Sequence, residues 1–260
     1  MLEWLKALPT SLPRQPEAIV VVTAHWEAAR FTVASGPRPG LIYDYGGFPP
    51  ETYRITYPAP GHPGVAQRVA ELAVAAGFPV ELDPAYGWDH GVFVPIAVSW
   101  PEADVPVVAV SLRAGLDPDE HLGFGAALAP LRHENVVIIG SGSSTHDLRM
   151  RVTRPQSEAF DQWLFDTMSA EPAARVAALA HWAQAPGGQA CHPREEHLLP
   201  LMVVTGAGGA DQATRSFHGE VFGHPMACYS IGRGRVHRIE LSIPVTTPAE
   251  AETLRHPQSP

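Results

Sequence analysis

Residues 18–24 read AIVVVTA, a run of small and β-branched side chains that follows Pro16 and stops at His25. A short continuous apolar run of this kind is typical of a strand that is buried on both faces. Two further runs have the same character, VPVVAVSL at 105–112 and NVVIIGSGSS at 135–144. We therefore predict that three buried strands form the centre of the fold.

Segments with helical spacing lie between and after these strands. Residues 65–76 place Val69, Leu72, Ala73 and Ala76 on one side of a helix, and Gly77 is a natural stop. Further helices are expected at 118–131, 155–168 and 173–183, with additional strands at 80–82 and 226–232. The alternation predicts an α/β fold, a single domain with a central, mainly parallel or mixed sheet flanked by helices.

The length of 260 residues suits one large domain, and we find neither an internal repeat nor a linker. We expect the domain to span residues 1–245. Residues 246–260 are polar and flanked by prolines, so we expect a frayed tail. Residues 1–12 have the spacing of an amphipathic helix, without the basic leader and apolar run of a signal peptide.

The composition excludes several function classes. A formal net charge of −9 argues against nucleic acid or an anionic membrane surface as a partner, so a small molecule is the expected substrate. No segment approaches the roughly 18 apolar residues of a membrane span. Cys191 and Cys228 are too few for a disulfide framework, which fits a cytoplasmic location. The single lysine, Lys6, lies on the N-terminal helix and is a poor Schiff-base candidate.

Histidines follow two of the predicted strands. His25 comes directly after the 18–24 strand, and His146 follows the 135–144 segment. Ligand sites in open α/β sheets gather beyond the carboxyl ends of the strands, so both imidazoles are expected in one crevice. An ordinary histidine at the start of a loop remains the alternative for each. His90 lies between Asp89, an acid that can hold its tautomer, and Gly91; a structural role is equally compatible with it.

The segment HPREEH at 192–197 is the richest in metal-binding side chains. It departs from the zinc protease motif, in which two histidines lie one helical turn apart. Here His192 and His197 are five positions apart, and Pro193 lies between them. His197 heads the apolar run LLPLMVV and is a metal-ligand candidate, whereas Glu195 or Glu196 is expected to cap that helix. Residues 140–144 lack the nucleophile elbow of serine hydrolases, and residues 206–209 fail as a dinucleotide fingerprint.

Residues 36–64 form a stretch that is rich in Gly, Pro and Tyr. It is too rich in proline for regular structure and too aromatic for simple disorder. We expect an ordered loop that lines a pocket.

Taken together, five stretches resemble the class III extradiol ring-cleavage dioxygenases of the DOPA 4,5-dioxygenase type. They occur in the order of that family and read VVVTAHWE (20–27), YDYGGFPPETYRITYPAPG (43–61), GWDHGVFVPI (87–96), GSGSSTHDLR (140–149) and HPREEHLLPL (192–201). The resemblance covers roughly residues 18–232. It implies a mononuclear non-haem metal, Fe(II) or Zn(II), one per chain, with an aromatic diol and O₂ as reactants.

Site roles follow from the resemblance by position. His25 and His197 match metal ligands of the family. His146 matches the histidine that acts as acid and base beside the substrate, and His90 matches a further catalytic histidine of the pocket. The residues expected to shape the aromatic slot are Tyr57 and the turn Gly46, Gly47 and Phe48.

Family members carry one more metal histidine on a strand with a His-Gly-Ser-Pro-like motif, ahead of the helix at which this sequence starts. Without that strand we expect an exposed edge or a gap in the sheet.

The first hypothesis is therefore an extradiol dioxygenase that cleaves a catechol-type ring. The alternative is a metal-poor, catalytically silent relative that acts as a small-ligand binding or partner subunit. A metal-dependent hydrolase is the third hypothesis. The sequence is also compatible with a homo-oligomer.

Overall fold

The computed structural model describes residues 1–147, 149 and 151–232. Its main sheet has five strands in the order β3-β2-β4-β1-β5. The strands of this sheet are β1 (Ala18–Ala28), β2 (Phe31–Ala34), β3 (Val80–Asp83), β4 (Val107–Arg113) and β5 (Val136–Ser141). Strand β1 is parallel to both β4 and β5, whereas β2 runs antiparallel to β4. The sheet is therefore mixed, and the predicted α/β fold with a mainly parallel or mixed sheet is confirmed.

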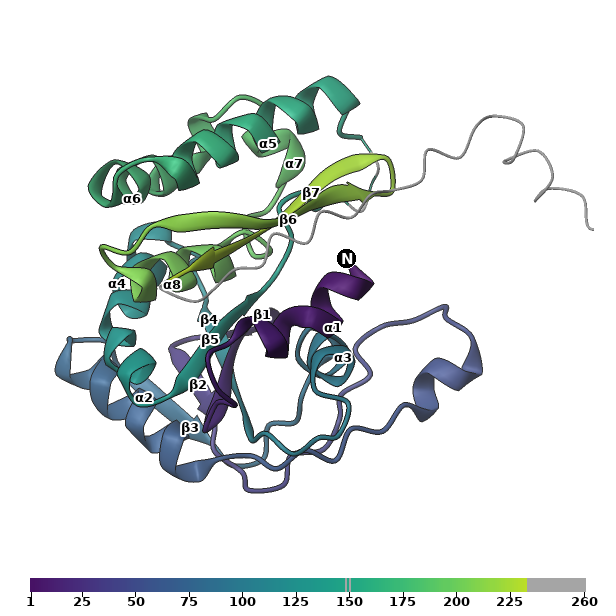
Figure 1. The fold of residues 1–260 in the computed structure, drawn as a ribbon, viewed down its shortest axis with the longest axis vertical. Helices are drawn as coiled ribbons and strands as arrows, with labels where there is room; N and C mark the ends of the chain where they lie inside the picture. The colour runs from purple at the N-terminus through teal and green to yellow at the C-terminus, as the bar shows by residue number, and fades with distance from the viewer. Residues whose placement is uncertain (148, 150, 233–260) are drawn as a thin grey trace, which may run out of the picture.

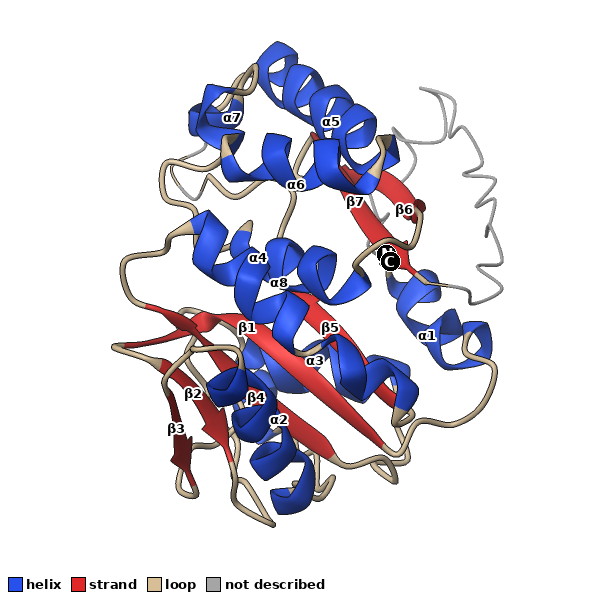
Figure 2. Cartoon of the chain, turned by 90° about the vertical axis from the view of Figure 1, so that its left-hand side faces the viewer, coloured by secondary structure: helices blue, strands red, loops and turns tan. Residues whose placement is uncertain are grey.

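Helices cover both faces of this sheet (Figures 1 and 2). The α-helices are α1 (Leu2–Ser11), α2 (Pro63–Ala75), α3 (His90–Ser99), α4 (Pro118–Ala127), α5 (Arg154–Ser169), α6 (Pro172–Ala180), α7 (Gly188–Cys191) and α8 (Leu199–Gly208). Three short 3-10 helices are η1 (Pro50–Arg54), η2 (Ala129–His133) and η3 (Trp182–Gln184). Strands β6 (Ala213–Val221) and β7 (His224–Ile231) form a separate antiparallel hairpin.

The period-two alternation of β1 divides the core into two layers. Val20 and Val22 point into a cluster with side chains of α2, α4 and α8. Ile19 and Val21 point the other way, into a cluster with α3 and with apolar residues of α1. All four valine and isoleucine side chains are fully buried, as the apolar run predicted. The fold is thus a three-layer sandwich that presents the carboxyl ends of β1 and β5 at one edge.

Several predicted boundaries were wrong. Strand β1 continues through His25 to Ala28, with a register irregularity between Val22 and Glu27. Strand β2 was not predicted because its four residues are too short for a periodic signal. Strand β6 was also missed, since its sequence ATRSFHGEV is largely polar. The predicted helix over 118–131 is α4 followed by η2, and the helix over 173–183 is α6 followed by η3.

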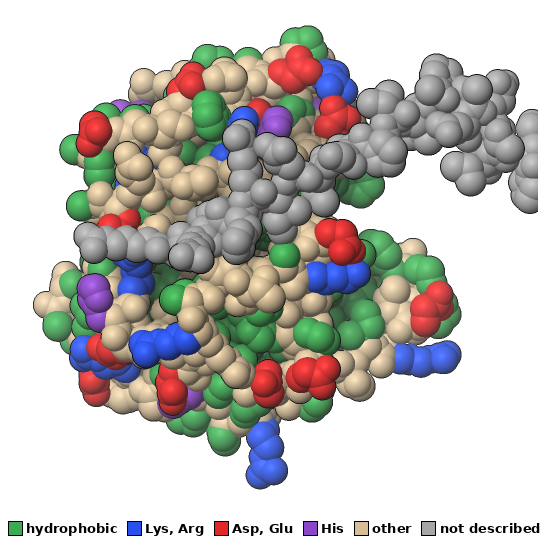
Figure 3. All heavy atoms as spheres, in the orientation of Figure 1, with side chains coloured by type: hydrophobic (Ala, Val, Ile, Leu, Met, Phe, Trp, Pro, Cys, Tyr) green, Lys and Arg blue, Asp and Glu red, His purple; other side chains and the backbone are tan. Residues whose placement is uncertain are grey.

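The predicted frayed tail at 246–260 and the end of the predicted domain at 245 lie outside the described residues. Within the described ranges, no helix combines the length and the apolar character needed to cross a membrane. On the face drawn in Figure 3, acidic and basic side chains are interspersed, and apolar side chains gather between α1 and the loop of residues 41–57. That loop exposes several large apolar residues, Ile42, Phe48, Tyr53 and Ile55.

Candidate active site

Four histidines from distant parts of the chain form one row at the carboxyl edge of the sheet. The Nε2 atoms of His25 and His197 lie 3.1 Å apart. The ring of His90 stacks on His25 with centroids 4.0 Å apart, and the ring of His146 stacks on His197 at 3.4 Å. The structure therefore brings together all four histidines that the sequence singled out.

His25 is held on β1 between neighbours that share its side of the strand. Thr23 donates a hydrogen bond from Oγ1 to Asp89 Oδ1 at 2.8 Å. That same carboxylate oxygen lies 3.5 Å from His25 Nδ1, and Asp44 Oδ2 lies 3.4 Å from it on another side. Neither contact is a hydrogen bond, because His25 Nδ1 has no hydrogen-bond partner among the described residues. The two carboxylates therefore act on the ring through their negative charge. Two carboxylates thus flank Nδ1 and leave Nε2 to face His197.

Gly91 permits this close packing at the N-terminus of α3. A Cβ atom on Gly91 would lie 3.0 Å from His25 Nδ1, 3.0 Å from Asp89 Oδ1 and 2.9 Å from Thr23 Oγ1. Distances this short require a shift of the neighbouring atoms. Glycine at this position therefore lets α3 approach β1 directly behind the imidazole.

His197 is oriented by the glutamate that precedes it. Its Nδ1 pairs with Glu196 Oε1 at 3.0 Å, and the same oxygen lies 3.5 Å from His146 Nδ1. Arg194 Nη1 lies 3.4 Å from Glu196 Oε2, and its guanidinium makes a two-pronged ion pair with Glu27 on β1. The expectation that Glu195 or Glu196 caps α8 was wrong, because the N-cap of that helix, Leu198, receives no side-chain cap and Glu196 serves the imidazoles instead.

His90 is held by an acid far from it in sequence. Asp44 Oδ1 accepts from the backbone N–H of His90 at 2.8 Å and lies 2.8 Å from its Nδ1. The sequence pointed to the adjacent Asp89 for this task, which the structure contradicts: Asp89 contacts Thr23, Tyr86 and His25. Asp44 was missed, although it stands inside the aromatic stretch that we expected to line the pocket.

Burial sets the protonation of the site. Burial, together with the neighbouring His146, His25 and His90, lowers the pKa of His197 to about 3. Burial also lowers the pKa of His146, and the nearby Glu196 carboxylate offsets part of that effect. For Asp44, burial opposes ionisation, but the hydrogen bonds from His90 outweigh it and its pKa lies below the usual value. At neutral pH the site therefore holds neutral imidazoles at His146 and His197 and an ionised carboxylate at Asp44.

This set of donors fits a metal ion. Glu196 only accepts hydrogen bonds and so favours a hydrogen on Nδ1 of His197, and the negative charges of Asp44 and Asp89 favour one on the nearby Nδ1 of His25. Both Nε2 lone pairs then face each other. Lone pairs 3.1 Å apart repel unless a cation or proton lies between them. Metal–nitrogen bonds of about 2.0–2.1 Å on one ion place two imidazole nitrogens roughly 3 Å apart, which matches this spacing. Two groups of metal-binding side chains meet here, His25 with Asp44 and His90, and His146 with Glu196 and His197.

The predicted aromatic slot is only partly next to these imidazoles. Tyr45 meets the ring of His90 edge-on with centroids 5.4 Å apart, and Phe48 packs on Tyr45 at 5.6 Å. Gly46 and Gly47 form the exposed turn between these two rings. Tyr57 instead lies in the core, where its hydroxyl donates to the carbonyl of Trp100 at 2.9 Å. Tyr45, which sequence reasoning missed, is the aromatic residue closest to the histidine row in the described contacts.

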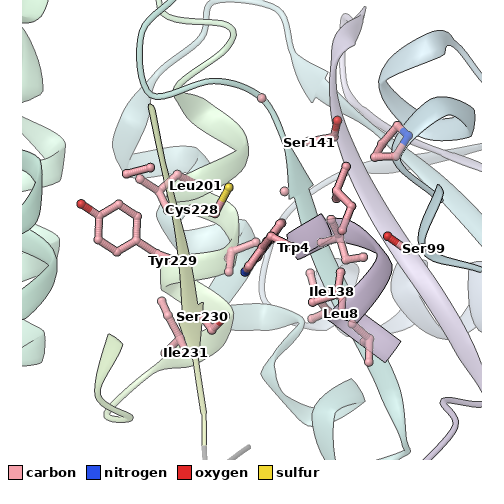
Figure 4. A pocket seen from close by; sticks show the side chains of 18 of the residues that line it. Trp4, Leu8, Ser99, Ile138, Ser141, Leu201, Cys228, Tyr229, Ser230 and Ile231 are labelled. Atoms are coloured by element: carbon pink, nitrogen blue, oxygen red, sulfur yellow. The ribbon is translucent and has the colours of Figure 1, made fainter. Parts of the chain in front are cut away.

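A cavity of about 480 Å³ runs along β5 (Figure 4). Of the four histidines, His197 belongs to its lining. Its walls include Trp4 and Leu8 of α1, Leu201 of α8 and Cys228 of β7, and one end touches Ser141 and His197. Among the described strands β5 pairs with β1 alone, so its second edge is free on this side. The further metal histidine implied by the resemblance stays a prediction.

The chain is similar to known proteins over most of its length. Residues 2–234 match the family model described as the catalytic LigB subunit of aromatic ring-opening dioxygenase. A 4,5-DOPA dioxygenase extradiol of Portulaca grandiflora is 40% identical over 216 residues, covering 80% of this chain and 78% of that protein. The protein of the same name from Escherichia coli K12 is 36% identical, with 78% and 76% covered.

A fungal relative and a solved structure extend the comparison. The dioxygenase tasH of Hapsidospora irregularis is 40% identical over 238 residues, covering 84% of this chain and 72% of that protein. The crystal structure of an uncharacterized protein from Escherichia coli K12 superposes with a TM-score of 0.75 at 32% identity, covering 88% of this chain and 91% of that one. By sequence, fold and the converging histidines, this chain belongs to the catalytic LigB family of aromatic ring-opening dioxygenases and is an extradiol dioxygenase.

Proposed function

We propose that this chain opens a catechol-type ring beside its two hydroxyls at one mononuclear non-haem metal ion, and that both atoms of O₂ enter the product. The observation that carries the proposal is the 3.1 Å approach of His25 Nε2 and His197 Nε2, each with its Nδ1 next to a carboxylate. The family supplies the reaction class, and the substrate class and the roles of individual residues are our proposals.

His25 and His197 are the proposed protein ligands of Fe(II), with Zn(II) as a metal found on isolation. Bound iron would supply coordination positions for the diol and for oxygen, and the change of oxidation state that zinc lacks. The carboxylates of Asp44, Asp89 and Glu196 keep the two imidazoles in the orientation and tautomer that binding requires.

His146 is the proposed acid and base. Its ring lies flat on His197 at 3.4 Å, and its Nδ1 faces Glu196 at 3.5 Å, so Nε2 is the atom left to exchange a proton. Its lowered pKa keeps it neutral at physiological pH, ready to accept a proton from a diol hydroxyl. The same nitrogen returns that proton later in the cycle.

His90 is the second proposed catalytic histidine. Asp44 occupies its Nδ1, which leaves Nε2 to bond the substrate or oxygen. We place the aromatic ring beside Tyr45 and the turn of Gly46, Gly47 and Phe48. Tyr57, the buried last residue of the 41–57 loop, would act on this slot indirectly, by holding the loop to Trp100.

The test is reconstitution without oxygen. Purified protein is loaded with Fe(II) under anaerobic conditions and then mixed with O₂ and a panel of catechols that includes L-DOPA, and oxygen uptake and the ring-opened chromophore are followed together. We expect one O₂ consumed per ring opened. Protein that takes up no metal supports instead the silent binding or partner subunit, and ester or amide turnover without oxygen uptake supports a hydrolase.

A further inference from the structure

We propose that Asp44 is a positioning residue that fixes the imidazoles of His25 and His90 together and ties the aromatic 41–57 loop to them. The inference rests on the proposed function of this site, because it assigns Asp44 a task toward the proposed metal ligand His25.

The two oxygens of Asp44 have different partners. Oδ1 lies 2.8 Å from both the backbone nitrogen and the Nδ1 of His90, and Oδ2 lies 3.4 Å from Nδ1 of His25. The two rings that it contacts stack on each other at 4.0 Å. One carboxylate therefore faces the Nδ1 atoms of two adjacent imidazoles, with a hydrogen bond to His90 and a charge contact to His25.

Asp44 also takes the place of a helix cap. Helix α3 starts at His90, and its N-cap residue Asp89 makes no side-chain cap bond. Asp44 accepts the His90 N–H from a loop 46 residues earlier in the chain. Its neighbours Tyr43 and Tyr45 pack against Phe93 of the same helix. The carboxylate thus joins the loop to the first residue of helix α3, His90.

An asparagine at this position distinguishes an effect on the His25 imidazole from the attachment of the loop to helix α3. The backbone N–H of His90 can only donate, so in Asp44→Asn the amide oxygen must keep the Oδ1 position and the NH₂ group must face His25 Nδ1. A donor at that place favours the His25 tautomer with its hydrogen on Nε2, the atom that faces His197. Asp44→Asn keeps the shape and the cap but opposes metal binding, whereas Asp44→Ala removes the cap without adding a donor.

The experiment measures Zn(II) affinity by chelator competition and the thermal unfolding of the metal-free protein. The variants are Asp44→Asn, Asp44→Ala and the control Asp104→Asn, an exposed aspartate that bonds Gln15. We expect Asp44→Asn to unfold close to wild type but to bind zinc about 10- to 100-fold more weakly, the usual cost of losing such a partner. Asp44→Ala should unfold at a lower temperature yet bind zinc no worse than Asp44→Asn, and the control should match wild type in both measurements.

A second readout follows the loop. With Fe(II) bound and catechol as the probe, Asp44→Ala should raise KM more than it lowers kcat, because the aromatic slot loosens. Two results would overturn the inference while leaving the proposed function intact. In the first, Asp44→Asn binds zinc within about threefold of wild type, a smaller loss than expected for such a partner. In the second, the zinc affinities of the variants follow the order of their thermal stabilities. A wild-type chain that binds no zinc would overturn the metal assignment and the inference with it.

Discussion

His25 and His197 are separated by 172 positions in the sequence, yet their Nε2 atoms lie 3.1 Å apart. Strand β1 brings one imidazole to the carboxyl edge of the sheet, and the segment before α8 brings the other. The Arg194–Glu27 ion pair joins these two elements two and three residues away from the imidazoles.

Replacing either imidazole should abolish stable metal binding. With metal affinities of about 10–16 kcal/mol shared over four ligands, loss of one ligand costs about 3 kcal/mol, on the order of a hundredfold. His25→Ala and His197→Ala should therefore lose iron on dialysis, as measured by elemental analysis. His181→Ala, at an exposed histidine, is the matched control and should retain it. Full metal content in both site variants would place the ion elsewhere.

His146→Ala should keep the metal but lose ring opening. A positioned acid or base contributes about 10²- to 10⁴-fold to rate, so kcat should fall within that range. Metal content and turnover of a catechol are measured on the same preparation. Unchanged turnover would refute the role of His146 as the proton carrier.

Gly91→Ala should disturb the site without removing any functional group. Its Cβ would lie about as close to His25 Nδ1 as a hydrogen-bonded atom, at 3.0 Å, so α3 must shift away from β1. We expect a loss of about 1–3 kcal/mol in the free energy of unfolding, together with weakened metal binding. Gly40→Ala is the control, because nothing lies within 4 Å of its added Cβ. Equal unfolding midpoints for the two variants in a denaturant titration would contradict this expectation.

His192 should make the fold sensitive to acid. Burial between Phe160 and Trp182 lowers its pKa to about 4, whereas the unfolded chain titrates near 6.5. Below pH 6.5 the unfolded state therefore binds a proton that the folded state does not, and the free energy of unfolding falls as the pH drops toward 4. The effect should reach about 2 kcal/mol between about pH 7 and about pH 5.

The comparison for that prediction is His192→Gln, which keeps a side-chain donor for the Ser144 carbonyl. Urea unfolding at about pH 7 and about pH 5 should show a smaller loss of stability for the variant than for wild type. The same loss in both proteins would assign the acid sensitivity to other groups.

Much of the architecture was readable from local patterns. The uninterrupted apolar runs that became β1 and β4 are buried on both faces, which requires helices on each side of a sheet. The third run became β5, which lies at the end of the sheet and is only half-buried after Val136, so its expected full burial was wrong. Elements without a periodic signal escaped prediction. Strand β2 is too short, β6 is too polar, and α3 is apolar on all sides, so its sequence did not distinguish a helix from a buried strand.

The sequence by itself determined the α/β class and the four histidines, because strand ends and a family-like order of motifs are properties of the linear chain. Only the tertiary structure decided which carboxylate holds which imidazole: Asp44 rather than Asp89 for His90, and Glu196 for His197 rather than for a helix end. The reason is physical. A hydrogen-bond partner depends on distances of about 3 Å between side chains, and those distances are set by how the helices and loops pack on the sheet rather than by the spacing of residues along the chain.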